Sequence, residues 1–138
     1  MTDGQACDRD LPPRLYHGTV VDREAPIRAE GIRPTSLERI VHTEFQRQSL
    51  GNAYFADSEK TAAFFAVASA VKASTPPTLK EGVVFVIDTK KAMEAGVCFK
   101  KTSGLDRATY GQEWTTYDTV PPESIVQTIR TSSNRRRR

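Results

Sequence analysis

Three residues with chemically useful side chains lie at the rims of short expected strands, each next to a long loop. They are His17 in YHGT, Tyr54 in YFADS and Glu113 in QEWTTYD. A histidine can hydrogen-bond a hydroxyl group, a tyrosine ring can stack on a flat ligand, and a fixed carboxylate can stabilise positive charge that develops in a transition state. Each residue alone has an ordinary structural explanation, as a core residue or a solvated strand end. The three together favour a common site.

The stretch RLYHGTV, residues 14–20, places His17 in the strand that opens the domain. It follows a Pro-Pro pair closely and reads as a short apolar strand. It nevertheless contains Gly18, a residue type that weakens the interior of a strand. Glycine allows another group to approach the backbone closely. The His-Gly pair therefore asks for partners elsewhere in the chain.

The other elements follow from hydrophobic patterning and turn residues. Strands are expected at 14–20, 53–56, 82–88, 97–100, 113–118 and 124–130, and helical segments at 22–30, 59–72 and 90–95. GVVFVID at 82–88 is a continuous apolar run, typical of a buried central strand. Asp57 or Ser58 is expected to cap the helix that follows it. Many short strands with two or three helices predict an α+β domain.

The length of 138 residues corresponds to one domain with a sizeable core. We expect a disordered arm at 1–12, a folded domain at 13–131 and a basic disordered tail at 132–138. The formal net charge is +3, and subtracting the four arginines of the tail leaves −1 for residues 1–134. A nearly neutral body argues against a wide nucleic-acid-binding face. The terminal NRRRR is interpreted as a solvated tail, with an electrostatic arm for phosphates as the alternative.

Location and cysteine chemistry are also constrained. No apolar run approaches the roughly 18 residues of a membrane span, and the polar, acidic start MTDGQACDRD argues against a Sec-type signal peptide. A cytoplasmic monomer is expected, with export by a non-classical route left open. Cys7 is interpreted as a thiol in the arm and Cys98 as a small hydrophobic residue in a strand. With two histidines and no Cys-x-x-Cys, no metal site is expected.

The three candidate residues belong to an ordered set of five short motifs, three of which contain one candidate each. The motifs are YHGT, I-x-x-E-G-I-x-P at 27–34, YFADSEKTAAFF, VVFVID and EWTTYD. In this ordered set the chain resembles the ADP-ribosyltransferase superfamily, in the His-Tyr-Glu branch of diphtheria toxin and the poly(ADP-ribose) polymerases. The resemblance covers nearly all of residues 14–130. It implies two small, packed, mainly antiparallel sheets with two to three flanking helices around an NAD cleft. It also implies transfer of ADP-ribose from NAD, as a substrate, through an oxocarbenium-like transition state.

The resemblance assigns a role to each residue of the site. Glu113 matches the carboxylate beside the ribose 2′-hydroxyl, and His17 matches the histidine that bonds the NAD ribose. Tyr54 matches the ring on which nicotinamide stacks. Gly18 matches the residue whose backbone contacts the nicotinamide amide, and Thr19 completes the motif toward the adenosine side.

The chain departs from the family pattern at two positions of the nicotinamide site. Phe65 stands where a second stacking tyrosine is usual, which keeps the aromatic face without the hydroxyl. Ala62 stands where poly(ADP-ribose) polymerases often have a serine that bonds the carboxamide, and this favours a toxin-like site. Arg33, Arg39 and Arg47 in the 33–52 loop are candidates for the pyrophosphate. A solvated loop charge explains each arginine equally well.

The acceptor of ADP-ribose is expected to meet the 101–112 loop, where Arg107, Tyr110 and Gln112 are candidates. Gly111 stands where many protein-modifying relatives have Gln or Glu, which weakens the case for an arginine-modifying enzyme. Protein, RNA, DNA and small molecules remain open as acceptors. Transfer of a single ADP-ribose unit is expected.

Two alternatives accompany this interpretation. RNA 2′-phosphotransferases also consume NAD and share YHGT, the E-G-[IL]-x-P turn and an ending like Val120-Pro121-Pro122-Glu123. That family has a histidine in place of Tyr54 and an apolar residue in place of Glu113. It also uses an N-terminal lobe with an Arg-His pair, for which residues 1–13 are too short. The other alternative is an inactive module that binds NAD or ADP-ribose.

Overall fold

The structure, a computed structural model, describes residues 7–34, 53–74, 80–102 and 107–132. Arg39, Arg47 and the expected tail after Ser132 lie outside the described residues. Along the chain the elements are β1 (Arg14–Val20), η1 (Val21–Arg23), α1 (Glu24–Glu30), β2 (Ala53–Ala56), α3 (Glu59–Ala73), β3 (Glu81–Asp88), α4 (Thr89–Glu94), β4 (Lys100–Thr102), α5 (Arg107–Tyr110), β5 (Glu113–Thr116), η2 (Pro122–Ser124) and β6 (Ile125–Ser132). The α+β class is confirmed.

The strands form one antiparallel sheet of six strands in the order β4-β5-β2-β1-β3-β6. The expectation of two packed sheets is therefore wrong. Pairing is nevertheless very uneven, because β1 pairs with β3 along its whole length but with β2 only where Tyr16 faces Ala56. The sheet thus consists of two three-stranded halves joined at one residue pair, a place that we call the β1–β2 junction.

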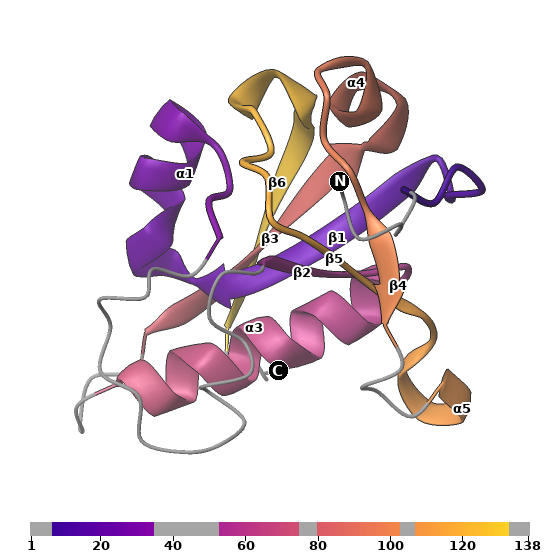
Figure 1. Ribbon diagram of the computed structural model, residues 1–138. Helices are drawn as coiled ribbons and strands as arrows, with labels where there is room; N and C mark the ends of the chain where they lie inside the picture. Colours follow the sequence, from indigo (N-terminus) through magenta and orange to yellow (C-terminus); the bar gives the residue numbers. More distant parts are fainter. Residues whose placement is uncertain (1–6, 35–52, 75–79, 103–106, 133–138) are drawn as a thin grey trace.

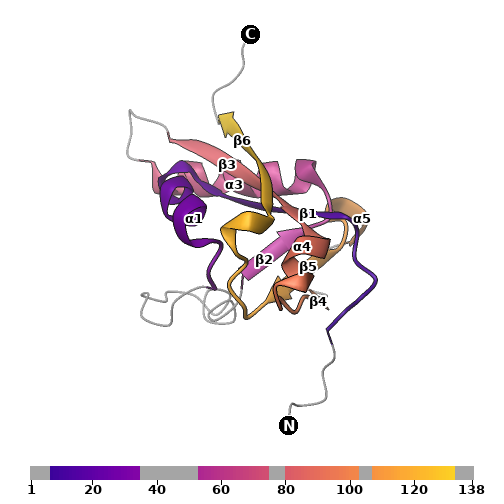
Figure 2. The same cartoon turned by 90° about the horizontal axis from the view of Figure 1, so that it is seen from above.

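Helices cover both faces of this sheet (Figures 1 and 2). The long helix α3 lies on one face, and the shorter helices α1 and α4 lie on the other. The larger core is on the α1 and α4 side and includes Phe55, Phe85, Phe99 and Trp114, while a smaller core lies under α3. Among the described helices, none has the length and apolar composition needed to cross a membrane.

The helix α3 lies close to the sheet because small residues meet at the contact. It begins after Ser58, whose side chain caps the first turn as expected. The side chains of Ala62 and Ala66 are buried against the sheet. A Cβ atom on Gly18 of β1 would collide with the backbone carbonyl of Ala62, and one on Gly82 of β3 would collide with the backbone of Ala66. The two glycines are therefore required where the helix backbone rests on the sheet.

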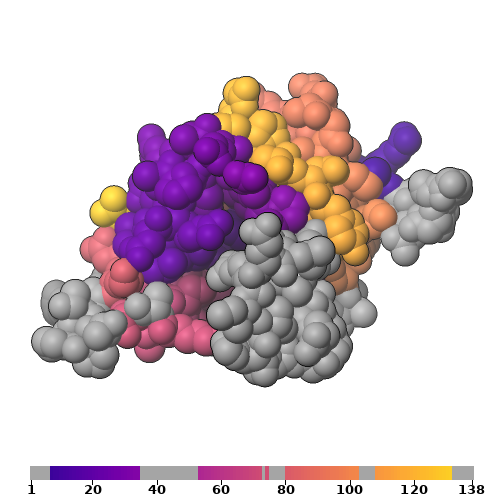
Figure 3. All heavy atoms as spheres, turned by 60° about the vertical axis from the view of Figure 1, so that its left-hand side comes forward, coloured from indigo at the N-terminus to yellow at the C-terminus, as the bar shows by residue number. Residues whose placement is uncertain are grey.

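The helix α1 is terminated by the residue after it, Gly31, which has a φ of 91° and donates its N–H to Ile27 O at 2.7 Å. The next residue, Ile32, exchanges two backbone hydrogen bonds of 2.9 Å with Val120. A Cβ atom on Gly31 would collide with the carbonyl of Val120. In Figure 3 the purple atoms of α1 and the residues after it adjoin the orange-yellow atoms near η2. The E-G-I-x-P and V-P-P-E words thus meet in one structural contact.

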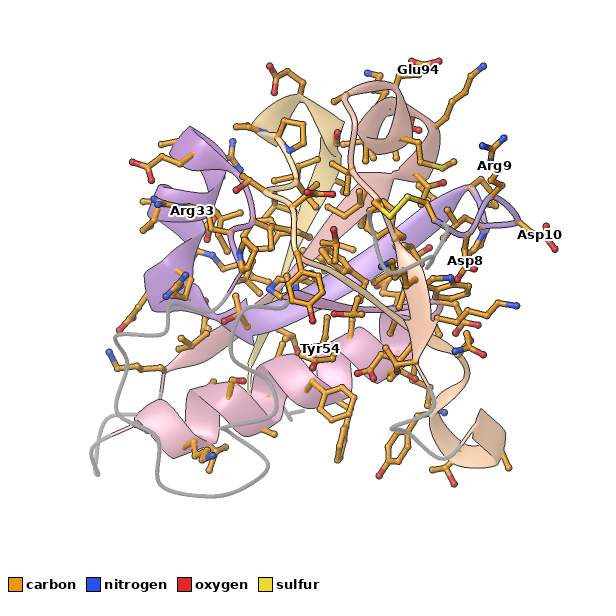
Figure 4. All side chains as sticks on the ribbon, viewed as in Figure 1. Asp8, Arg9, Asp10, Arg33, Tyr54 and Glu94 are labelled. Carbon is orange, nitrogen blue, oxygen red and sulfur yellow. A yellow bond between two sulfur atoms is a disulfide. The ribbon has the colours of Figure 1, made fainter. Side chains whose placement is uncertain are left out.

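The cysteines correct one expectation from the sequence, because Cys7 and Cys98 form a disulfide (Figure 4). Asp8 extends this contact by donating its N–H to Phe99 O at 2.8 Å. The segment from Cys7 onward is thus bound to the domain, and the disordered arm expected at 1–12 is too long. Disulfides persist mainly in oxidising compartments. This bond counts against the expected cytoplasmic location, which stays a prediction.

The attachment of this segment also explains why β4 begins later than expected. A strand was expected at 97–100, yet the ladder with β5 runs over Lys100–Thr102. The backbone of the preceding residues is bonded elsewhere, with the Cys98 N–H donating to the carboxylate of Asp118 at 2.8 Å. The expected 113–118 strand correspondingly ends at Thr116.

Candidate active site

His17 bridges the β1–β2 junction with its side chain. Its Nδ1 lies 2.8 Å from the backbone carbonyl oxygen of Tyr54, and its ring packs against Phe55 with the centroids 5.3 Å apart. Since a carbonyl oxygen only accepts, Nδ1 carries the proton. Burial lowers the pKa of His17, the bond to Tyr54 opposes this, and the positive charge of Arg23 lowers it further. The imidazole is therefore neutral near pH 7, and Nε2 presents a lone pair as a hydrogen-bond acceptor.

Gly18 presents a backbone edge at the same place. Backbone N–H and C=O groups alternate in direction along a strand, so those of Gly18 point toward β2, as those of Tyr16 do. The ladder between the two strands consists of the pair Tyr16 and Ala56. If the ladder continued, Gly18 would face Tyr54, but the carbonyl of Tyr54 accepts from His17 instead. The junction thus brings a glycine backbone edge beside a neutral imidazole.

Tyr54 and Glu113 lie on one face of the paired strands β2 and β5. Their neighbours Phe55 and Trp114 point into the larger core, so alternation directs Tyr54 and Glu113 toward the α3 side. In Figure 4 the side chain of Tyr54 reaches from β2 toward α3. Thr115 is the direct partner of Tyr54, which makes Glu113 its diagonal neighbour. Such neighbours are roughly 7–8 Å apart, within reach of long side chains.

The carboxylate of Glu113 is partly buried and held by one neighbour. Its Oε1 accepts a hydrogen bond of 2.6 Å from Oγ1 of Thr102, the residue that faces it on β4. Burial raises the pKa of Glu113, and the bond from Thr102 lowers it. One carboxylate oxygen is thus fixed in direction in a site where ionisation is less favourable than in water.

The three triad candidates are linked in steps, but the structure divides them between the two faces of the sheet. Glu113 and Tyr54 share a face of β2 and β5, and Tyr54 is bonded through its backbone to His17. The ring of His17 lies on the Phe55 side of the sheet. Among the described side-chain contacts, none joins His17 directly to Glu113. Thr19, the last residue of the motif, is partly buried in β1 opposite Val83.

The two residues assigned to the far side of the nicotinamide slot have different surroundings. Ala62 is buried in the small core under α3, where it packs with Ala66 and Val84. The ring of Phe65 is partly buried, with centroids 5.3 Å from Phe64 and 5.8 Å from Tyr110. The described ring contacts of Phe65 therefore come from α3 and α5. Stacking of nicotinamide between Tyr54 and Phe65 stays a prediction.

The expected acceptor residues are divided by the structure. Tyr110 adjoins Phe65 and is fixed by its carbonyl, which accepts from Thr61 Oγ1 at 2.8 Å. Gln112 is buried, and its amide donates to the carbonyls of Thr102 and Glu113 at 2.8 and 2.9 Å. Gln112 therefore joins β4 to β5, and contact between Gln112 and an acceptor stays a prediction. The backbone of Arg107 begins α5.

Gly111 is required by its surroundings. It has a φ of 81°, in the left-handed region that favours glycine, and a Cβ atom there would lie 2.5 Å from Oδ1 of Asp57. The backbone N–H of Asp57 donates to Gln112 O at 3.2 Å, and this bond holds the segment with Gly111 and Gln112 against Asp57. A Gln or Glu at position 111, as many protein-modifying transferases have, would not fit without a change in this loop.

Two residues near the site were not foreseen. Thr102 bonds Glu113, but its position opposite the carboxylate depends on the register of β4 against β5, which the sequence does not display. Arg23 follows β1 and is exposed, and its positive charge lowers the pKa of His17. It is a better-placed candidate for an anion than Arg33, which is exposed and paired with Glu30 at 2.8 Å.

No group of three His, Cys, Asp or Glu side chains suited to a metal ion occurs in the described ranges. No protein-family model matches the chain, and no curated protein matches it. The functional interpretation therefore depends on the geometry of the junction together with the sequence resemblance.

Proposed function

We propose that the protein cleaves the nicotinamide–ribose bond of NAD and transfers a single ADP-ribose unit to an acceptor. The observation that carries the proposal is the interrupted pairing at the β1–β2 junction. There the His17 ring takes the place of a ladder bond, and among the described residues β2 provides no ladder partner for the backbone edge of Gly18. In a fully paired sheet the backbone N–H and C=O of Gly18 would bond to the neighbouring strand. Here a ligand with an amide group can bond to them instead.

The proposed roles follow from donors and acceptors. The amide of nicotinamide carries both an N–H and a C=O, which complement the backbone C=O and N–H of Gly18. Nε2 of His17, as a neutral acceptor, receives a ribose hydroxyl. Glu113 stabilises the positive charge that grows on the ribose as nicotinamide departs. Tyr54, on the same face as Glu113, supplies the aromatic surface for the nicotinamide ring.

The reaction balances without any further reagent. The bond between ribose C1′ and the nicotinamide nitrogen breaks, and nicotinamide leaves as a neutral molecule with the bonding electron pair. An acceptor hydroxyl, amine or ring nitrogen then forms a bond to C1′ and loses one proton to solvent or to a base. If water is the acceptor, the product is ADP-ribose. Arg23, near His17, is the described cation proposed to face the pyrophosphate.

Nicotinamide release from NAD by the purified protein tests this proposal. We expect Glu113→Gln to lower the release rate on the order of 10²–10³, the range for removal of one preorganised electrostatic group. Glu94→Gln is the matched control, because Glu94 is exposed at the end of α4, far from Tyr54 in Figure 4. An unchanged rate in Glu113→Gln would refute the assignment of the site.

The two alternatives predict different products. A 2′-phosphotransferase would form a cyclic phosphate of ADP-ribose from 2′-phosphorylated RNA, and an inactive module would bind NAD without releasing nicotinamide. Two of the words shared with the phosphotransferases, E-G-I-x-P and V-P-P-E, have a structural explanation in the contact between Ile32 and Val120. Incubating a lysate with labelled NAD shows whether the label enters protein, RNA, DNA or small molecules.

A further inference from the structure

The carboxylate of Glu113 is oriented by β4. Thr102 is the last residue of that strand and the direct partner of Glu113, so both side chains leave the ladder on the same face. The hydroxyl of Thr102 donates to Oε1 of Glu113 at 2.6 Å. A hydrogen bond to a charged acceptor is shorter and stronger than one between neutral groups.

A buried side chain holds the two partners in register. The Nε2 group of Gln112 donates to the carbonyls of Thr102 and Glu113, at 2.8 and 2.9 Å. Since both partners are carbonyls, the donor must be the amide nitrogen. This places one side chain across the ends of β4 and β5 beside the carboxylate. Movement of Thr102 relative to Glu113 would break bonds that are shielded from water.

We propose that Thr102 is a positioning residue, whose hydroxyl fixes Oε1 of Glu113 so that Oε2 is directed at the ribose of the bound dinucleotide. The inference depends on the proposed function. A carboxylate that is free to rotate would spend part of its time turned away from the growing positive charge. The Thr102 hydroxyl also stabilises the ionised form, in a place where burial favours the protonated form.

The test compares Thr102→Val with the wild type in two measurements. The first is the pH dependence of kcat/KM for nicotinamide release, and the second is the NMR titration of the ¹³C-labelled Glu113 carboxyl. We expect a rate loss of about tenfold, the equivalent of one hydrogen bond. We also expect the acidic limb and the carboxyl midpoint to move upward by roughly one pH unit. The Thr102 hydroxyl donates to the ionised carboxylate of Glu113, so its loss makes ionisation less favourable and moves both the acidic limb and the midpoint to higher pH.

Two further variants separate positioning from general damage. Thr102→Ser keeps the hydroxyl and should restore both the rate and the midpoint. Thr128→Val is the control, a strand threonine on β6 whose hydroxyl contacts Arg28 at 3.4 Å, and it should change neither.

Unchanged midpoints and acidic limbs in Thr102→Val would overturn the inference while leaving the proposed function intact. A wild type that releases no nicotinamide would overturn the proposed function. In that case the carboxyl titration alone decides whether Thr102 holds the Glu113 carboxylate.

Discussion

His17 and Tyr54 are joined across the β1–β2 junction by a side chain rather than by the ladder. The hydrogen bond runs from the Nδ1 of His17 to the carbonyl of Tyr54 at 2.8 Å. This bond fixes which ring nitrogen carries the proton and which presents a lone pair. It also gives the backbone carbonyl of Tyr54 a side-chain donor, beside the pairing of Tyr54 with Thr115 of β5.

The neutral state of His17 makes the stability of the protein depend on pH. The pKa of His17 is lowered in the folded protein, so below the ordinary histidine pKa of 6.5 the unfolded chain binds a proton more readily. His17 therefore contributes stability that is present above about pH 6.5 and is lost as the pH falls toward its folded pKa. We expect wild type to lose more stability than His17→Gln between about pH 7.5 and pH 5.5. Urea denaturation at both pH values measures this difference.

Arg23→Gln is the companion variant for this experiment. Removal of the positive charge should raise the pKa of His17 in the folded protein and so bring it closer to the pKa in the unfolded chain. The variant should therefore lose less stability than wild type between about pH 7.5 and pH 5.5. Other titrating groups cancel when each variant is compared with wild type at the same two pH values. Equal pH dependence in wild type and His17→Gln would contradict the neutral state of the partly buried imidazole.

The contact between Gly18 and α3 predicts a strong effect of a single methyl group. Gly18→Ala should destabilise the fold by about 1–3 kcal/mol or more, because its Cβ would collide with the carbonyl of Ala62. The atom in the way belongs to the backbone, so Ala62→Gly should give no rescue. Thermal unfolding of the single and double variants measures this. Recovery of stability in the double variant would show that the Ala62 side chain, not the helix backbone, is the obstacle.

The Cys7–Cys98 disulfide predicts a redox-dependent stability. Reduction, or replacement of both cysteines by serine, should lower the free energy of unfolding by about 2–4 kcal/mol, since a long loop of the unfolded chain is no longer closed. Denaturation with and without a reductant measures the change, and the double serine variant should be insensitive to the reductant. A wild type that is equally insensitive would indicate that the two thiols are not bonded.

Hydrophobic patterning predicted most of the elements but not how they join. Residues 97–99 alternate between the core and a less buried position, as in a strand, and Val97 and Phe99 are indeed buried. Their backbone groups are nevertheless bonded to residues distant in sequence, such as Asp8 and Asp118, so the ladder starts later. Likewise, one sheet rather than two results from the single pair Tyr16 and Ala56, which no local pattern reveals.

The site shows the same division between local and long-range information. His17, Tyr54 and Glu113 could be selected because their residue types and flanking words are visible in the sequence. Thr102 could not, since an ordinary strand threonine becomes significant only through the register of β4 and β5. The burial of Gln112 could not be foreseen either, because it results from packing and not from the position of Gln112 in a polar segment.

The disulfide also divides the covalent connectivity of the chain. The closed ring from Cys7 to Cys98 contains His17 and Tyr54, whereas Glu113 lies outside it. One peptide-bond cleavage inside the ring leaves both fragments linked through sulfur. One cleavage between Cys98 and Glu113 separates the carboxylate covalently from the imidazole and the tyrosine. Limited proteolysis thus has different outcomes at these two places. Only a cut between Cys98 and Glu113 leaves Glu113 on one fragment and His17 and Tyr54 on another, with no covalent link between them.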